Sequence, residues 1–307
     1  MGKRALTPSH LCLRWGPMTT ATAPRLIRVG HSPDPDDAFM FYALAKEKIP
    51  MRGFRVEHLI EDIESLNQRA MRNELEVTAV SCHAYAYIAD HYLVKRAGAS
   101  VGFQYGPILV GRPMEKTQAP LTPKDLRGKR IAIPGRLTTA YLVLQLFEKE
   151  FEPVFIPFDQ IFDAVQTGKA DLGLIIHEGQ ITYESHGFQK LLDLGVWWYE
   201  QHQLPLPLGL DVIRRDLGTE TIHAFTRLFK ESVEYALAHR AEALEYALQY
   251  GRGISAQLGD QFVGMYVNDF TVELGREGQN GLTKLLELGY QKGLLPKLVK
   301  PAFVELS

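Results

Sequence analysis

The sequence predicts a two-lobed α/β protein, and two observations lead to this prediction. From Arg25 onward, short apolar runs alternate with helical patterns, which is typical of sheets whose strands are connected by helices. The order strand, helix, strand, helix, strand then occurs twice, so each copy is expected to form its own lobe. With 307 residues, of which 46% are hydrophobic, the chain can bury a core in each lobe.

The first copy is expected to begin with a strand at residues 26–29. A helix should follow, capped by Asp36 or Asp37 and continuing to Lys48, because apolar residues recur there at helical spacing. The same reasoning predicts a strand at 54–59, a helix at 63–72 and a strand at 77–80.

The second copy predicts strands at 129–133, 154–156 and 172–176, with helices at 138–149 and 158–167. A Pro-rich extended passage at 204–209 leads into a strand at 210–214. The rest of the chain has helical patterns, at 220–238, 241–250, 260–269 and 281–292.

These elements predict how the chain divides. Residues 25–111 and 211–307 are expected to form a discontinuous first lobe with a helical C-terminal third, and residues 112–210 the second lobe. Extended crossovers near Val110 and Gly209 would then join the lobes around a cleft, where ligands usually bind.

Residues 1–24 are expected to be a disordered or dispensable tail. Residues 11–15 are too short and interrupted for the apolar region of a signal peptide, and Met18 offers an alternative start. At most one disulfide can form from Cys12 and Cys82, which favours a reducing compartment. The expected location is therefore the cytoplasm.

Charge and hydropathy restrict the partners. The net charge of -2 gives no general attraction to nucleic acid or to anionic lipid. No run approaches the roughly 18 apolar residues of a membrane-spanning helix. The expected partner is a small molecule, with no nucleic acid and no membrane, and the oligomeric state stays open.

Two strand ends in the first copy carry polar groups that could meet a ligand. The turn at 30–37, which includes Ser32, leads into a helix whose N–H groups could face an anion, although a plain capped helix start explains it equally well. Residues 81–85 follow the strand at 77–80, and here too a helix cap with a surface His83 is the alternative.

Two further candidates lie in the second copy. Thr138 and Thr139 precede an apolar helix, whose start can hold a carboxylate, although a Thr cap needs no ligand. His177 and Glu178 end a fully apolar strand, where a histidine can act as a general base or be purely structural.

Several common site motifs are absent from the sequence. The histidines and cysteines show no metal-binding spacing, so no metal is expected. Neither glycine-rich nucleotide motif occurs, so no nucleotide cofactor is expected, and the absence of Gly-x-Ser-x-Gly weakens a serine hydrolase.

Three stretches, at 32–44, 134–141 and 174–178, together resemble the 1,4-dihydroxy-6-naphthoate synthase family of the futalosine route to menaquinone. The resemblance runs from about Arg25 to the C-terminus, and further stretches support it, at 193–198, 204–209 and 232–239. Each motif alone is weak, but their order and joint presence are specific.

The resemblance implies a fold similar to type II periplasmic substrate-binding proteins, with two lobes around a cleft. It also implies a cofactor-independent lyase that cleaves cyclic dehypoxanthine futalosine as its ring system aromatises. By the same resemblance His177 is the proton acceptor. The substrate contacts that it implies are Thr138 and Thr139, and the segment Ala79, Val80 and Ser81.

The substrate implied by the resemblance carries a benzoate carboxylate, which needs N–H donors or a cation. The helix start at Thr138, assisted by Arg136, is expected to supply them. The chain departs from the family pattern at Asp34 and Asp36, which replace the usual Cys and Asn and add two carboxylates to the turn. His31 and His83 are expected to offset this charge if they line the same cleft.

Two alternatives to this function remain. A non-catalytic solute-binding protein would share the fold, because fold alone does not determine function. Chorismate dehydratase, a sibling enzyme of the same pathway and fold, is the second. The His177-Glu178 strand end and the Thr138-Thr139 pair resemble the naphthoate synthase more than the dehydratase.

Overall fold

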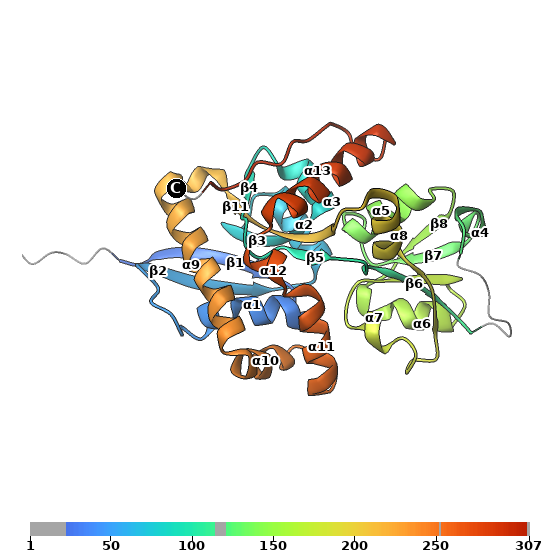
Figure 1. Ribbon diagram of the computed structural model, residues 1–307, viewed down its shortest axis with the longest axis horizontal. Coiled ribbons are helices and arrows are strands. Elements are labelled where there is room, and N and C mark those ends of the chain that lie inside the picture. Colours follow the sequence, from blue (N-terminus) through green and yellow to red (C-terminus); the bar gives the residue numbers. More distant parts are fainter. Residues whose placement is uncertain (1–22, 114–120, 252, 306–307) are drawn as a thin grey trace, which may run out of the picture.

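The computed structural model describes residues 23–113, 121–251 and 253–305. Two β-sheets, each flanked by helices, form two lobes that lie side by side (Figure 1). The predicted tail at 1–24 falls almost wholly outside the described residues. Among the described residues, no helix has the length and apolar character needed to cross a membrane.

The first sheet has the strand order β2-β1-β3-β11-β4, with β5 also pairing with β11. Strand β1 runs parallel to both β2 and β3, whereas β11 runs antiparallel to β3, β4 and β5. The bounds are β1 (Arg25–His31), β2 (Phe54–Ile60), β3 (Val77–Ser81), β4 (Tyr92–Val94), β5 (Ser100–Gly102) and β11 (Leu206–Arg214).

The second sheet has the order β10-β6-β9-β7-β8. Strand β7 is parallel to β8 and β9, so the strand and helix pattern of the first sheet is repeated, and β6 is antiparallel to β9 and β10. The bounds are β6 (Ile108–Gly111), β7 (Arg130–Ile133), β8 (Glu152–Phe155), β9 (Leu172–Ile175) and β10 (Gln189–Asp193).

The chain passes between the two sheets twice, before β6 and before β11. Strand β6 pairs in the second sheet, although it precedes the predicted boundary at 111. Strand β11 begins at Leu206 and pairs in the first sheet, although its first residues precede the predicted boundary at 210. At both crossovers the chain thus enters the next sheet a few residues earlier than expected. The lobe boundaries themselves stay a prediction.

Thirteen α-helices are formed by the described residues. The first-lobe helices before the crossover are α1 (Pro35–Ala45), α2 (Ile63–Met71) and α3 (Cys82–Ile88). The helices between the crossovers are α4 (Pro123–Leu126), α5 (Thr139–Phe147), α6 (Ile161–Gln166), α7 (Gly179–Thr182) and α8 (Leu194–His202). The C-terminal helices are α9 (Thr219–Ala238), α10 (Arg240–Leu248), α11 (Ala256–Tyr266), α12 (Asp269–Val272) and α13 (Gly275–Gln291).

Several predicted helix boundaries were wrong: α1 ends at Ala45 rather than Lys48, and α13 begins at Gly275 rather than at 281. Helix α1 is capped by Asp34 rather than by Asp36 or Asp37, because Pro35 is favoured at the first helical position and starts the helix earlier. The helix predicted at 260–269 is instead α11, which begins after the Ser255 cap, followed by the separate α12.

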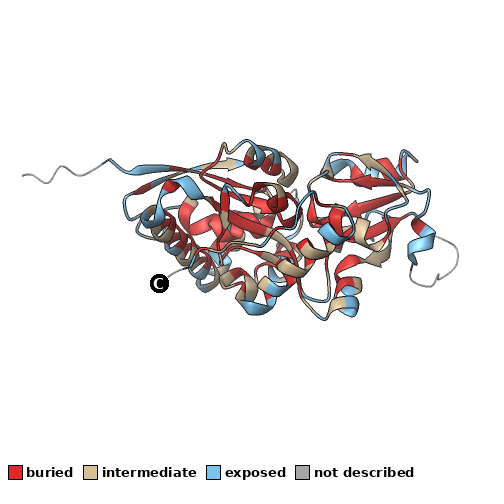
Figure 2. Cartoon of the chain, turned by 90° about the horizontal axis from the view of Figure 1, so that it is seen from above, coloured by how far each residue is buried: buried red, intermediate tan, exposed pale blue. Residues whose placement is uncertain are grey.

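Helix α1 is buried on all sides, so its packing holds the start of the helix in one position beside the space between the lobes. It packs against α9 and α10, and its core residues include Phe39, Met40 and Phe41. Figure 2 shows that buried residues follow the strands and their covering helices in both lobes. Each sheet thus forms a rigid support for the loops at its edge.

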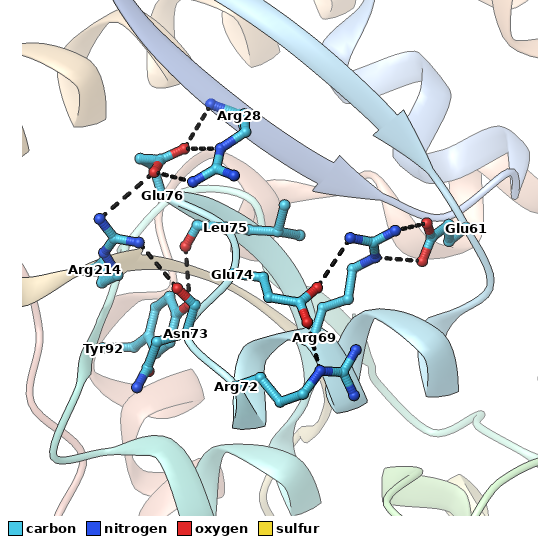
Figure 3. A network of polar contacts seen from close by, with 10 residues as sticks. All are labelled: Arg28, Glu61, Arg69, Arg72, Asn73, Glu74, Leu75, Glu76, Tyr92 and Arg214. Carbon is cyan, nitrogen blue, oxygen red and sulfur yellow. Dashed lines mark hydrogen bonds and ion pairs between the residues drawn. The ribbon is translucent and has the colours of Figure 1, made fainter.

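A polar network fixes the connection into β3 (Figure 3). Glu76 accepts hydrogen bonds from Arg28 of β1 at 2.7 and 2.9 Å and pairs with Arg214 of β11 at 3.5 Å. Arg69 of α2 pairs with both Glu61 and Glu74. Three neighbouring strands and α2 are therefore held in register at the end of the sheet where β3 begins.

Candidate active site

An open pocket, called the cavity below, lies between the two lobes and takes lining residues from both. It is lined by the ends of strands and the starts of the helices that follow them, as expected for ligand sites in α/β sheets. Its polar lining residues are Ser32, Asp34, Asp36, Asp37, Ser81, Ser100, Thr138, Thr139, Gln180 and Tyr266.

The turn between β1 and α1 forms one wall of this cavity. The Ser32 N–H donates to Asp37 Oδ2 at 2.8 Å, and the Asp34 N–H donates to Ser32 Oγ at 3.1 Å. The Ser100 hydroxyl donates to Asp36 Oδ2 at 3.3 Å. The cavity is thus acidic on this side, and Ser32 lines it as predicted from the sequence.

These carboxyl groups hold protons unusually strongly. Burial, together with the nearby charge of Asp34, raises the pKa of Asp36 to about 7. Burial also raises the pKa of Asp37 well above its ordinary value, and the charges of Asp36 and Asp211 add to this. At neutral pH this wall therefore retains protons rather than carrying its full formal charge.

Strand β3 presents alternate residues to the cavity. Ala79 and Ser81 line it, whereas the Val80 side chain is fully buried in the core, because successive side chains in a strand point to opposite faces. Ser81 is fixed by Asn67, whose Oδ1 accepts from the Ser81 N–H at 2.9 Å and whose Nδ2 donates to Ser81 Oγ at 3.1 Å.

The start of α5 forms the opposing wall through Thr138, Thr139 and Ala140. Thr138 caps the helix by accepting from the Tyr141 N–H at 3.3 Å and donates its own hydroxyl to the Gly135 carbonyl at 3.0 Å. The Thr139 hydroxyl donates to the Leu208 carbonyl at 2.5 Å. Both hydroxyl protons and the Tyr141 N–H are therefore engaged. The N–H groups of Thr139 and Ala140, which have no acceptor inside the helix, are the donors left for a ligand.

His177 lies one residue beyond Ile176, which lines the cavity, but is not itself part of the lining. Its Nδ1 accepts from the Gly179 N–H at 3.0 Å, so its Nε2 carries the proton and donates to the Phe158 carbonyl at 3.1 Å. Glu178 Oε2 lies 3.6 Å from Nδ1. Both ring nitrogens thus contact the protein, and the role of His177 as a base stays a prediction.

The structure does not bring Arg136 to the cavity lining. The side chain is exposed, and its guanidinium carbon lies 3.9 Å from the ring centroid of Phe155. The predicted contact between Arg136 and a substrate therefore stays a prediction, and the stacking on Phe155 explains the present position of the side chain.

The expectation that His31 and His83 offset the acidic turn was wrong. Burial and the neighbouring His58 lower the pKa of His31 to about 4, and burial lowers the pKa of His83 to about 4. Both imidazoles are neutral at pH 7, and neither lines the cavity. A neutral ring cannot cancel the charge of a carboxylate.

Sequence reasoning missed two lining residues that contact each other across the two lobes. Tyr266, from α11, donates its hydroxyl to Gln180 Oε1 of α7 at 2.6 Å. No motif marks either residue, and only the packing of the C-terminal helices on the first lobe brings Tyr266 here. Within the described ranges, no group of three or more His, Cys, Asp and Glu side chains is arranged to hold a metal ion.

A family model described as menaquinone biosynthesis matches residues 27–291 of this chain. The chain belongs to this family. A relative from Thermus thermophilus, named 1,4-dihydroxy-6-naphthoate synthase, is 39% identical over 278 residues, which make up 91% of this chain and 99% of the relative. The resemblance stated from the sequence is therefore confirmed, and the chain is a member of a family of menaquinone-pathway enzymes.

Solved structures confirm the fold class. A protein from Archaeoglobus fulgidus is 47% identical with a TM-score of 0.82, and the match covers 90% of this chain and 100% of that chain. The alkanesulfonate-binding protein SsuA from Xanthomonas axonopodis is 13% identical with a TM-score of 0.67, covering 91% and 97%. At that identity the likeness shows the fold alone, and this fold is periplasmic-binding-protein-like.

Proposed function

We propose that this chain is a 1,4-dihydroxy-6-naphthoate synthase, a carbon–carbon lyase that converts cyclic dehypoxanthine futalosine to 1,4-dihydroxy-6-naphthoate. The observation that carries the proposal is the 39% identity to the Thermus thermophilus enzyme of that name over 99% of its length. The interlobe cavity supports the proposal, because its lining combines apolar surface with polar groups from both lobes. The proposed location is the cytoplasm, and the proposed reaction uses no cofactor or metal.

The reaction requires a base to remove a proton from the carbon beside a ketone. We assign this role to His177, because imidazole is the most frequent general base and the residue directly follows cavity-lining Ile176. Loss of the sugar-derived fragment then allows the remaining ring to become aromatic, which drives the reaction without any change in the redox state of a cofactor. A positioned base contributes typically 10²–10⁴-fold to such a step.

His177 must free a lone pair before it can accept a proton. Its Nδ1 lone pair is shared with the Gly179 N–H, and Nε2 already carries a hydrogen. We therefore expect the bond between Gly179 and Nδ1 to break when substrate enters, with Nε2 still donating to the Phe158 carbonyl. This carbonyl would then stabilise the imidazolium that forms.

The substrate carboxylate is proposed to bind at the start of α5. The N–H groups of Thr139 and Ala140 belong to the first turn of a nine-residue helix, where the helix dipole favours an anion. The hydroxyls of Thr138 and Thr139 fix the backbone by bonds to Gly135 and Leu208. Binding at this point would place the rest of the substrate in the space between the lobes.

The test is a product assay by mass spectrometry with purified protein, cyclic dehypoxanthine futalosine and neither metal nor nucleotide. Formation of dihydroxynaphthoate is expected, and His177→Asn should lower turnover at least about a hundredfold while substrate still binds. His186→Asn is a matched control, because that exposed ring stacks on Phe162 outside the cavity lining.

The other outcomes of this assay identify other functions. Dehydration of chorismate without dihydroxynaphthoate formation would indicate the dehydratase of the same pathway. No reaction with either compound, together with stabilisation of the fold by small carboxylates, would indicate a solute-binding protein. Near-normal turnover by His177→Asn would remove His177 as the base.

A further inference from the structure

Carboxyl groups are concentrated on one side of the cavity. Asp34, Asp36 and Asp37 all line it from the start of α1. A fourth carboxyl, from Asp211 of β11, lies behind Gly98, since a Cβ atom on that lining glycine would be 2.2 Å from Asp211 Oδ2. Asp211 is 1% exposed, and neither of its oxygens has a hydrogen-bond partner among the described residues.

The buried cation near this group lies away from Asp36. Lys95 Nζ is 3.9 Å from Asp211 Oδ1 and 3.2 Å from the ring centroid of Phe229. Burial lowers the pKa of Lys95, and the charges of Asp211 and Asp37 oppose this shift. Lys95 therefore interacts with these two carboxyl groups. Among the described residues, no ion pair reaches Asp36.

Asp36 is therefore the carboxyl that faces the cavity without a compensating charge. Its Oδ2 accepts from Ser100, and the N–H groups of Asp36 and Asp37 also favour its ionised form. Burial and the charge of Asp34 oppose ionisation more strongly, so the pKa of Asp36 rises to about 7. The other ionisable groups that face this turn are Asp211, Lys95 and the buried hydroxyl of Tyr266.

A protonated carboxyl has different binding properties from a carboxylate. It offers one O–H donor and a carbonyl acceptor, whereas an ionised Asp36 would offer acceptors only and would repel an anion. The start of α5, on the other wall, carries no acidic side chain in its first turn and presents N–H groups. The wall at α1 is therefore suited to a neutral oxygen of the ligand, and the wall at α5 to its anionic group.

We propose that the protonated carboxyl of Asp36 is the hydrogen-bond donor that selects a neutral carbonyl or hydroxyl oxygen of the ligand, while the start of α5 binds the ligand's carboxylate. The cavity accordingly favours a monoanion with an uncharged oxygen at its far end. A second carboxylate at that end would lie beside the charge of Asp34, which already acts on Asp36, and is disfavoured. This inference deepens the proposed function and rests on it, because it assigns the orientation of the substrate in the same cavity.

The first test measures binding and requires no turnover. Two probes share a benzoate carboxylate and differ in the second group: 3-acetylbenzoate carries a neutral ketone, and isophthalate carries a second carboxylate. Isothermal titration calorimetry at pH 6 is expected to show at least tenfold tighter binding of 3-acetylbenzoate. At pH 8.5 this binding should weaken at least tenfold, because Asp36 has lost its proton.

Variants identify Asp36 as the source of this effect. In Asp36→Asn the amide remains a donor at every pH, so the loss of 3-acetylbenzoate binding between pH 6 and 8.5 should disappear. At pH 8.5 isophthalate should bind more tightly to Asp36→Asn than to wild type, because the variant lacks the carboxylate charge. Asp216→Asn removes the same formal charge from an exposed residue outside the cavity lining and should behave like wild type. Equal binding of the two probes at pH 6, no measurable 3-acetylbenzoate binding at millimolar concentration, or an unchanged pH dependence in Asp36→Asn would overturn the proposal.

The second test uses the reaction. The kcat/KM of wild type should fall above about pH 7. Asp36→Ala should lower kcat/KM at least tenfold at pH 6. Asp36→Asn should recover most of that loss, and its kcat/KM should not fall above pH 7. A fall that persists in Asp36→Asn would assign the pH dependence to another ionisable group, such as Asp37, Lys95 or Asp211, and overturn the proposal. If wild type lacks the lyase activity, the proposed function fails, whereas the calorimetry still decides whether Asp36 selects a neutral oxygen.

Discussion

The starts of α1 and α5 occupy the same place in their lobes and have opposite character. Helix α1 follows β1 and helix α5 follows β7, and each of these strands pairs in parallel with two neighbours. Both helix starts line the cavity. Helix α1 has acidic residues at its cap and in its first turn, whereas α5 has Thr138 as its cap and no charged residue in its first turn. A repeated fold has therefore produced two unlike walls around one ligand space.

The two turns are also held differently. The turn before α1 is closed within its own lobe, because Asp37 accepts from the Ser32 N–H. The turn before α5 is held from the other lobe, because Glu64 of α2 accepts from the Leu137 N–H at 2.9 Å. The acidic wall is thus built into one lobe, whereas the position of the N–H-rich wall depends on how the lobes meet.

The strongest test of this contrast removes an N–H group from the start of α5. Thr139→Pro is compatible with the first helical position, since Thr138 already has an extended backbone. Losing one hydrogen bond to a charged group costs about 1.5–3 kcal/mol, so KM should rise about 10- to 100-fold with little change in kcat. Steady-state kinetics with cyclic dehypoxanthine futalosine measure both constants.

Thr139→Val is the matched control, because it loses the hydroxyl but keeps the N–H. It should raise KM by less than Thr139→Pro, through loss of the bond to the Leu208 carbonyl. Equal effects of the two variants would mean that the hydroxyl and not the amide binds the ligand. Unchanged KM with lower kcat in both would remove the start of α5 from ground-state binding.

A second test breaks the contact between the lobes at the α5 turn. A Cβ atom at Gly135 would lie 2.5 Å from Glu64 Oε2, so Gly135→Ala should force the carboxylate away from the Leu137 N–H. We expect ligand affinity to fall about tenfold, the loss of roughly one hydrogen bond at 1.4 kcal/mol. Calorimetric titration of 3-acetylbenzoate measures this change.

Two variants of Glu64 show whether this interlobe bond is responsible. Glu64→Ala removes the acceptor and should reproduce the effect of Gly135→Ala, whereas Glu64→Gln keeps a neutral acceptor oxygen and should lose less affinity. Wild-type affinity in Glu64→Ala would show that the position of α5 does not depend on the other lobe.

The sequence predicted which residues line the cavity better than it predicted which side chains are charged there. Ser32, Ala79, Ser81, Thr138 and Thr139 line the cavity because they follow or end strands, and strand ends are visible as the limits of apolar runs. Strands of three residues, such as β4 and β5, have too short a pattern to be found this way.

Charge complementarity alone was a poorer guide than strand ends. Arg136 lies on Phe155 outside the cavity lining, so its predicted contact with a carboxylate stays a prediction, whereas His31 was expected to carry charge and is buried and neutral. Tyr266 is 86 residues from its partner Gln180, so their contact depends on tertiary packing that no local pattern encodes. Burial, which decides whether a side chain is charged and which way it points, was the information missing from the sequence.

The smallest expected effect concerns stability and tests whether the acidic wall holds its proton. Because the pKa of Asp36 is about 7 in the folded protein and 3.8 ordinarily, the folded state binds more protons between these values, and its contribution to the free energy of unfolding falls as pH rises. Buried His31, His58 and His83, each with a pKa lowered to about 4, act in the opposite direction below pH 6.5. Asp37 and Asp211, whose pKa values are also raised, act in the same direction as Asp36. The wild-type curve therefore combines all these effects, and the difference between wild type and Asp36→Asn reports Asp36 together with its influence on Asp37.

Urea denaturation of wild type and Asp36→Asn at pH 5, 6.5 and 8 gives that difference. The variant should gain stability relative to wild type by at least about 1.4 kcal/mol between pH 5 and pH 8, which corresponds to one unit of pKa separation. Thr138→Ser, at the start of α5, introduces no ionisable group, so its difference from wild type should be the same at all three pH values. A pH-independent difference for Asp36→Asn as well would mean that Asp36 ionises normally, and the acidic wall would then repel every anion that the α5 wall attracts.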